Sequence, residues 1–177
     1  MTRMTARTLV AICVWMAACD ASHRPEISSA SNPAPAPPAE GGPVFTLRLA
    51  GTDVADFVSA RLSIKSVEVK SAQALLSNTV STATVDLTTP DHAYLLTSFQ
   101  VPTGVDEVEF AVAFGAGTVD RAQQTFAVDD GCDVLRLTGK VSEIAVRKHA
   151  VIQLDLARSF VPRGGAMMLV PHFQLVY

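Results

Sequence analysis

The sequence predicts an all-β fold, an antiparallel β-sandwich that follows a signal peptide and a disordered linker. Many short segments alternate apolar and polar side chains, which is the period of a half-buried strand. Glycine, proline and aspartate separate these segments, as turns require. No amphipathic pattern is long enough for the roughly ten-to-twelve-residue helices of an α/β fold. We therefore expect about nine short strands packed as a sandwich.

The first two predicted strands have clear faces. Residues 44–49 alternate, with apolar side chains at the odd positions. Residues 58–69 alternate next, with apolar side chains at even positions up to Ile64 and at odd positions from Val67. Because a strand has a period of two, this slip predicts a β-bulge or a strand break at Lys65-Ser66.

The rest of the domain supplies shorter strands and their turns. A brief helical turn is expected at residues 91–96, after Pro90. Gly115-Ala116-Gly117 and Gly164-Gly165 are expected to be hairpin turns, because neither is followed by the helical pattern or the Lys-Ser/Thr of a phosphate loop. Pro171 should lie at an edge or a bulge, since proline cannot donate to a ladder. The remaining expected strands are residues 82–87, 107–114, 124–128, 134–138, 142–147, 150–156 and 167–176.

Residues 1–18 have the pattern of an export signal. Arg3 and Arg7 form a basic start, and an apolar run follows up to Ala18. The run has about half of the roughly 20 apolar residues that a membrane-spanning helix needs. The sequence therefore predicts a signal peptide rather than a permanent span.

Cys19 is the expected lipidation site. Met16-Ala17-Ala18-Cys19 resembles the bacterial lipobox, which implies diacylglycerol on the Cys19 sulfur, cleavage before Cys19 and acylation of the new N-terminus, with palmitate as the type of chain. Buried acyl chains contribute about 0.8 kcal/mol per CH₂, and more than one chain gives stable anchoring. Met16 departs from the usual leucine, and plain secretion and an uncleaved anchor are the alternatives. Asp20 resembles a retention signal of some lineages, and the choice of inner or outer membrane stays open.

A linker and one domain are expected after the signal. Residues 19–43 are rich in proline and alanine and form an extended spacer of about 3.1 Å per residue where they adopt the polyproline conformation. Residues 44–177 fit the commonest single-domain size of ~100–150 residues. We expect a protein of the bacterial cell envelope, anchored through lipid on Cys19 and facing the periplasm or the cell exterior.

Charge argues against nucleic acid and anionic lipid headgroups as partners. Loss of Arg3 and Arg7 with the signal lowers the formal net charge from −3 to −5. Both partners are bound mainly through lysine and arginine, so a mildly acidic domain is poorly suited to them.

Two segments that open the domain, residues 47–53 and 60–69, and two that close it, residues 151–160 and 169–173, resemble the bacterial family called domain of unknown function 4382, which is found in many lipoproteins. The opening segments match the family's first strand, aspartate-bearing turn and "sVeV" strand. The closing segments match its "D-x-A-R-S" element and "L-x-P" strand. The resemblance implies an immunoglobulin- or transthyretin-like sandwich and no assigned activity.

The acidic turns and the histidines are the candidate metal ligands. The family's acidic opening turn is thinner here, with Asp53 and Asp56 only, and Asp129, Asp130 and Asp133 match no calcium-loop spacing. His92, His149 and His172 lack the spacing of a zinc site. We expect solvated turns, no metal and no cofactor.

Other residues are assigned structural roles. Asp155 and Arg158 are expected to lock a strand end through a bidentate pair. Cys132, the one thiol left in the domain, is expected to be a small buried residue, with a redox or pairing site as the alternative. Its acidic neighbours would raise the thiol pKa rather than activate it as a nucleophile.

The expected function is a non-enzymatic binding or structural module with a protein or glycan ligand, for which Tyr94 is the candidate stacking residue. The alternative is an exported hydrolase or metal-dependent enzyme whose histidines meet carboxylates on one rim.

Overall fold

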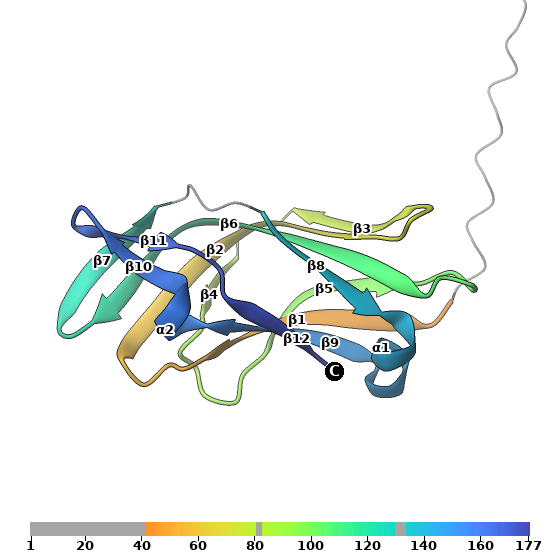
Figure 1. Ribbon diagram of the computed structural model, residues 1–177, viewed down its shortest axis with the longest axis horizontal. Coiled ribbons are helices and arrows are strands. Elements are labelled where there is room, and N and C mark those ends of the chain that lie inside the picture. The colour runs from red at the N-terminus through yellow and green to blue at the C-terminus, as the bar shows by residue number, and fades with distance from the viewer. Residues whose placement is uncertain (1–41, 81–82, 130–133) are drawn as a thin grey trace, which may run out of the picture. The chain divides into compact units, whose positions relative to one another are not determined.

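The computed structural model describes residues 42–80, 83–129 and 134–177 (Figure 1). Twelve strands and two short helices lie in these ranges, so the all-β prediction is confirmed. In chain order the elements are β1 (Val44–Thr52), β2 (Phe57–Lys70), β3 (Leu75–Val80), β4 (Thr84–Asp86), β5 (Tyr94–Gln100), β6 (Glu107–Arg121), β7 (Gln124–Asp129), β8 (Leu135–Lys140), α1 (Val141–Arg147), β9 (His149–Asp155), α2 (Leu156–Ser159), β10 (Phe160–Arg163), β11 (Ala166–Leu169) and β12 (Phe173–Val176).

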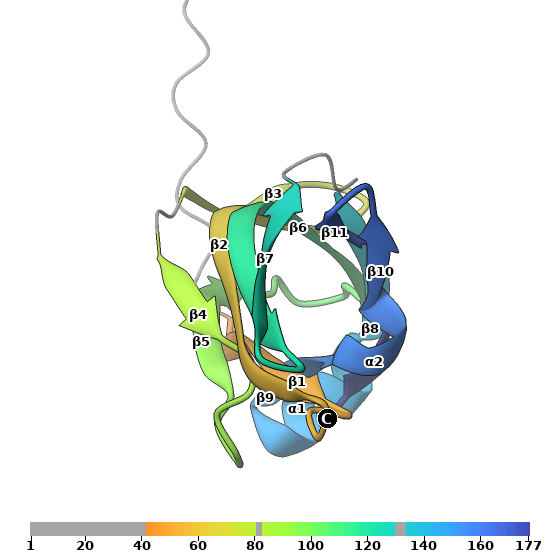
Figure 2. The ribbon, with the colours of Figure 1, turned by 90° about the vertical axis from the view of Figure 1, so that its left-hand side faces the viewer.

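The strands form two sheets that pack against each other (Figure 2). One sheet has four strands in the order β12-β9-β1-β5. The other follows β10-β11-β7-β6-β2-β3, with β4 also paired to β2 and β8 to β6. The predicted sandwich is confirmed. Its strand pairs are mostly antiparallel, but β1 runs parallel to β9 and β11 runs parallel to β7, so both sheets are mixed.

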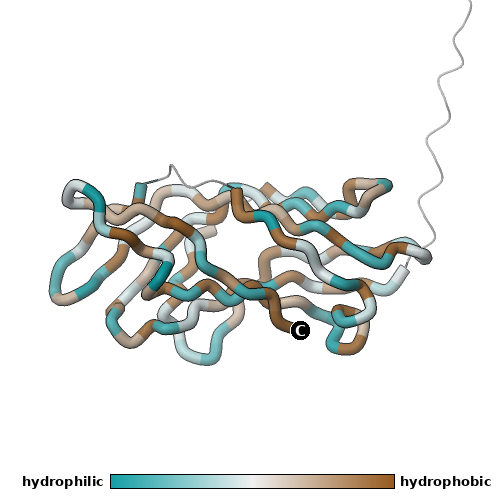
Figure 3. Tube along the Cα trace, in the orientation of Figure 1, coloured by the Kyte–Doolittle hydropathy of each residue, from teal (hydrophilic) through white to brown (hydrophobic). Residues whose placement is uncertain are grey.

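The core lies between the sheets, and alternation along the strands fills it. Phe45, Leu47 and Leu49 of β1 are at most 1% exposed, as their odd positions predicted. Phe99 of β5 packs edge-on against Phe110 of β6, with ring centroids 5.6 Å apart, and so joins the two layers. Figure 3 shows the same alternation of apolar and polar residues along the strands. Each large side chain buried this way contributes roughly 1.5–3 kcal/mol.

The predicted slip in β2 is confirmed. Ile64 is buried before the slip and Val67 after it, while Lys65 between them is exposed. The register with β6 shifts between Ile64 and Ser66. The irregularity returns the apolar side chains to the core face after the extra residue.

The strand predicted at residues 142–147 is wrong, because this segment is helix α1. Ile144 is fully buried, and Val141 and Ala145 pack against the core beside it. These positions share one helical face, since side chains three and four residues apart lie together on a helix. Lys148 ends the helix in the left-handed conformation, with φ of 64°. Over so few residues the helical and strand periods are hard to tell apart.

Two segments near β5 also differ from the prediction. The helical turn expected at residues 91–96 is wrong, because Asp91 has left-handed backbone, residues 92 and 93 are in no helix, and β5 begins at Tyr94. The strand β3 was not predicted, because its residues, Leu75–Val80, do not alternate cleanly and none is fully buried.

The two glycine pairs behave differently. Gly164 and Gly165 form the predicted turn between β10 and β11, both with positive φ. Gly115-Ala116-Gly117 lies inside β6 instead of in a hairpin turn, which corrects the prediction. A Cβ on Gly117 would lie 2.2 Å from the carbonyl oxygen of Arg61, so glycine here permits the close approach of β6 to β2.

The single strand predicted at residues 167–176 is two strands in different sheets. β11 belongs to the larger sheet and β12 to the four-stranded sheet, and Pro171 lies in the connection between them. Proline cannot donate to a ladder, which fits its place where the chain leaves one sheet for the other.

The hairpin between β6 and β7 yields a stability prediction. Arg121 pairs with Gln124, so the turn has two residues, Ala122 and Gln123, with φ of 51° and 64°. Left-handed backbone costs a non-glycine residue roughly 1–2 kcal/mol, and such turns prefer glycine at the second position.

We expect Gln123→Gly to raise the free energy of unfolding by about 0.5–1 kcal/mol, seen in urea unfolding as a higher midpoint with unchanged slope. The control Ala127→Gly, within strand β7, should lower it by a similar amount. A Gln123→Gly variant no more stable than the parent would contradict this account of the turn.

Candidate functional site

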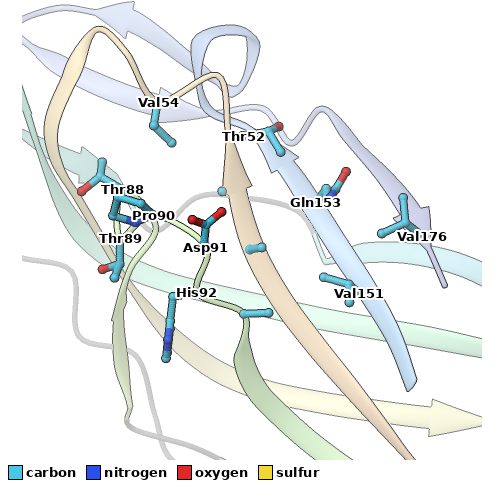
Figure 4. Close-up of a pocket in the computed structure, with 13 residues that line it drawn as sticks. Thr52, Val54, Thr88, Thr89, Pro90, Asp91, His92, Val151, Gln153 and Val176 are labelled. Atoms are coloured by element: carbon cyan, nitrogen blue, oxygen red, sulfur yellow. The ribbon is translucent and has the colours of Figure 1, made fainter. Parts of the chain in front are cut away.

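A hollow of about 520 Å³ lies on the outer face of the four-stranded sheet, beside the loop that joins β4 to β5 (Figure 4). Strands β1, β9 and β12 form its floor, and the loop forms one wall. Its lining consists of Ala50, Gly51, Thr52, Val54, Thr88, Thr89, Pro90, Asp91, His92, Ala93, Val151, Gln153 and Val176.

Strand register places the floor side chains in rows. Ala50 pairs with Gln153, and Gln153 pairs with Gln174, so these three form one row across β1, β9 and β12. Val151 and Val176 form the next row, together with the exposed Arg48 of β1, which is not part of the lining of the hollow. Ala50, Val151 and Gln153 alternate with buried residues of β1 and β9, and Gln174 and Val176 alternate with Leu175, which packs against the core. These side chains therefore point away from the core. The floor is therefore apolar at one end and bears amides at the other.

A close backbone approach fixes the loop on the sheet. A Cβ on Gly51 would lie 2.1 Å from the carbonyl oxygen of Leu87, so only glycine lets the start of the loop lie on β1. Leu87 is itself buried, and its N–H donates to the carbonyl oxygen of Ala60 at 2.9 Å. The wall of the hollow is thus anchored in the core.

Asp86 ties the loop to strand β2. Its Oδ1 accepts from the N–H of Ala60 at 3.1 Å and from the N–H and hydroxyl of Thr88 at 3.2 and 2.8 Å. Its Oδ2 accepts from Nε of Arg61 at 3.4 Å. Partial burial raises the pKa of the Asp86 carboxyl, but the hydrogen bonds from Thr88, Ala60 and Arg61 outweigh it and hold the pKa below the usual range.

Asp91, which lines the hollow, and Asp53, which follows Thr52 at the end of β1, have left-handed backbone. Asp91 has φ of 51° and Asp53 has φ of 52°. Asp91 is exposed, and Figure 4 shows its carboxylate between the loop and β1. No hydrogen bond or ion pair among the described residues involves this carboxylate. It is an open acceptor at the rim of the hollow.

A second, smaller hollow of about 260 Å³ adjoins the first and shares Thr52 and Gln153 with it. The amide of Gln174 donates to Oε1 of Gln153 at 2.7 Å and fixes both side chains. Thr52, Asp53, Gln153, Asp155, Arg158, His172, Phe173 and Gln174 line this second hollow.

Asp155 and Arg158 lie together, but not as the predicted bidentate pair. Oδ1 of Asp155 accepts from the backbone N–H of Arg158 at 2.9 Å, which caps helix α2. The Arg158 Nε lies 4.0 Å from Oδ2, and its side chain is 70% exposed. The carboxylate therefore stabilises the helix start, and the guanidinium is directed to solvent.

The three histidines occupy separate places. His92 lines the larger hollow and His172 the smaller one, while His149 lines neither. His149 and His172 lie toward opposite ends of β9, because the carbonyl oxygen of His172 accepts from the N–H of Asp155. Within residues 42–80, 83–129 and 134–177, no three histidines, cysteines or acids come together as a metal site.

Tyr94 is not an open stacking platform. Its hydroxyl donates to the carbonyl oxygen of Asp86 at 2.9 Å and lies 3.2 Å from the hydroxyl of Thr89. The ring of His92 packs edge-on against it, with centroids 4.3 Å apart. Tyr94 therefore holds the loop that forms the wall.

Asp120 also accepts several hydrogen bonds, and it lies in the larger sheet. The hydroxyls of Ser59 and Thr125 donate to it, and these hydrogen bonds hold its pKa below the usual range. This carboxylate joins β2, β6 and β7 and is a structural group.

Several predicted residues lie outside the part of the chain that the structure describes. These are Cys19, Asp130, Cys132 and Asp133, together with residues 1–41. Asp129 is described and is exposed at the end of β7. The helices among the described residues are too short to cross a membrane.

Sequence reasoning missed most of the site. Asp91, Gln153 and Gln174 follow no motif, and strand register alone brings the two glutamines together. One signal was available: Asp86-Leu87-Thr88-Thr89-Pro90 has the aspartate and threonine spacing of a hydrogen-bonded turn.

Comparison of the chain with known families, curated proteins and solved structures gives no match. The resemblance to domain of unknown function 4382 therefore stays a prediction from its motifs.

The Asp86 network predicts a pH-dependent stability. We expect Asp86→Ala to lower the free energy of unfolding by about 1–2 kcal/mol at pH 7. Because folding lowers the pKa of Asp86, its stabilisation is present above the unfolded pKa of about 3.9 and disappears as pH falls through the folded value. Urea unfolding of both proteins from pH 7 to pH 3 checks this. A difference that stays constant over the range would contradict it.

The close approach of Gly51 to the backbone of Leu87 predicts that a side chain at position 51 displaces the β4–β5 loop. We expect Gly51→Ala to push the loop off β1 and to lower stability by about 1–3 kcal/mol, because the new Cβ meets backbone that cannot turn aside. Gly104→Ala is a control for glycine loss, since a Cβ there meets nothing, although its φ is positive. Proteolysis that cleaves residues 87–93 no faster in Gly51→Ala than in the parent would contradict this.

Proposed function

We propose that this chain is a bacterial envelope lipoprotein whose β-sandwich is a non-enzymatic binding module, held to a membrane by lipid on Cys19. The ligand is proposed to bind the outer face of the four-stranded sheet, in the hollow beside the β4–β5 loop. The observation that carries the proposal is this preformed hollow, whose wall is fixed by Gly51, Leu87 and Asp86.

The anchor rests on the sequence. A basic start and a short apolar run precede Cys19, and residues 19–43 then supply an extended spacer rich in proline. A spacer of this kind lets a domain act at a distance from the lipid surface. Anchoring through the lipid on Cys19 needs no contact between the domain and the membrane.

The binding role rests on the geometry of the sheet. Small-molecule sites are concave, largely preformed and of about 300–1,000 Å³, with a few well-placed polar groups on an apolar lining. The hollow agrees in size and in composition, with Ala50, Val151, Val176 and the amide of Gln153 on the floor and Asp91 at the rim. Because the core anchors its wall, little ordering is needed when a ligand binds.

The alternative function, a hydrolase or metal-dependent enzyme, receives less support. His92 lies near Asp91, and His172 lies near Asp155, but each pair lines a different hollow. Among the described residues no hydrogen bond joins a histidine side chain to a carboxylate or to a nucleophile. No specific contact in the described ranges favours this second function.

Fatty-acid labelling tests the anchor. We expect the full chain, expressed in a bacterium with radiolabelled palmitate, to take label and to partition into detergent. Cys19→Ala should lose both properties, because the acylated sulfur and the cleavage site are removed. Cys13→Ala, which changes a cysteine inside the apolar run, should retain both. A parent chain that takes no label and stays in the aqueous phase would refute the anchor.

A further inference from the structure

We propose that the larger hollow binds a neutral, hydroxyl-rich ligand, that is, a glycan, with Asp91 and Gln153 as its principal hydrogen-bonding groups. This inference rests on the proposed binding function and names the class of ligand. Four properties of the hollow carry it: its amphipathic lining, its mixture of donors and acceptors, its charge and its size.

The lining has an apolar floor and a polar rim. Ala50, Val151 and Val176 are half-buried and present small aliphatic surface. Thr52, which follows the floor along β1, and Asp91, which comes from the loop, add oxygen atoms at the edge. A pyranose ring has C–H faces and hydroxyl edges, so it can lay one face on the floor while its hydroxyls reach the rim.

The hydrogen-bonding groups require a ligand that both donates and accepts. The Asp91 carboxylate only accepts when ionised, and no described residue occupies it. Gln153 uses its oxygen to accept from Gln174, which leaves its amide N–H groups as donors toward the hollow. A hydroxyl donates and accepts at one atom, so neighbouring sugar hydroxyls can satisfy Asp91 and Gln153 together.

Charge disfavours the other polar ligands. Among the described residues that line the larger hollow, none is lysine or arginine, and Asp91 is the acid. A phosphate or carboxylate ligand would therefore lie against a like charge. A basic group has donors only, so it would pair with Asp91 but would leave the Gln153 donors unused.

Size indicates more than one sugar unit. The smaller hollow continues the site past Thr52 and Gln153, toward His172 and Arg158. A ligand that fills both would be an oligosaccharide, with Gln153 between its units. If the ligand occupied the larger hollow alone, substitution of Arg158 would leave its affinity unchanged.

A glycan array tests the proposal. The full-length lipidated chain in detergent is applied to immobilised neutral oligosaccharides, to their uronate and sialylated counterparts, and to a lysine-rich peptide. We expect binding to a subset of neutral glycans and weaker binding to anionic ones. Asp91→Asn should reduce that binding by about tenfold, since it removes the charge that strengthens hydrogen bonds from sugar hydroxyls.

Matched variants separate this effect from misfolding. Asparagine tolerates left-handed backbone as aspartate does, so Asp91→Asn should keep the loop conformation and the unfolding midpoint. Asp129→Asn removes an exposed carboxylate from the other sheet and should bind like the parent. Gln153→Ala should lose binding as Asp91→Asn does.

Three results would overturn the proposal: no neutral glycan bound by the parent, stronger binding to the lysine-rich peptide, or binding unchanged in both Asp91→Asn and Gln153→Ala. Palmitate labelling of Cys19 is independent of the array. A chain that takes label but binds no glycan would refute the ligand class alone, and a chain that takes no label would refute the anchor whatever the array shows.

Discussion

The parallel ladder between β1 and β9 is the constraint on which the rest of the structure depends. It joins Thr46–Thr52 to His149–Asp155, about 100 residues later in the chain. On the inner side this pairing aligns Leu47 and Leu49 with Ala150 and Ile152 in the core. On the outer side the same register sets Ala50 beside Gln153. One ladder therefore serves both the packing of the sandwich and the floor of the candidate site.

The wall of the site depends on the other sheet. Asp86 ends β4, which pairs with β2, and its carboxylate accepts from backbone of β2 at Ala60. The chain then crosses to the four-stranded sheet, where Gly51 admits the backbone of Leu87. The hollow thus forms where a connection between the two sheets lies over β1. Groups that hold the fold together, Asp86 and Tyr94 among them, are the groups that place Asp91.

Alternation of apolar residues and turn residues predicted the strand faces, the irregularity in β2 and one hairpin turn, because these features depend on residues close together in the sequence. The odd-numbered apolar residues of β1 and the slip at Lys65-Ser66 follow from a period of two, which burial on one face enforces. The turn at Gly164-Gly165 follows from glycine chemistry. Residues 142–147 were mistaken for a strand, because one turn of amphipathic helix and three alternating strand positions differ little in so short a segment.

Non-local features escaped prediction for a different reason. Gly117 lies inside a long strand because β2 passes close beside it. The chain changes sheets at Pro171 because β11 pairs with β7 and β12 pairs with β9. The candidate site is of this kind. Gln153 and Gln174 meet only through the register of β12 on β9, and Asp91 joins them only because Gly51 lets the loop dock. A single sequence carries no local signal for such contacts between residues that are far apart in the chain.

Amide hydrogen exchange measured by NMR tests the central role of the β1–β9 ladder. The N–H of Thr46 donates to the carbonyl oxygen of Lys148, and with a period of two the amides of Arg48 and Ala50 also face β9. We expect these two amides to exchange only through global unfolding, with an opening free energy equal to that from urea unfolding. Exchange of Arg48 and Ala50 through local opening, at a free energy near that of the loop amides, would contradict it.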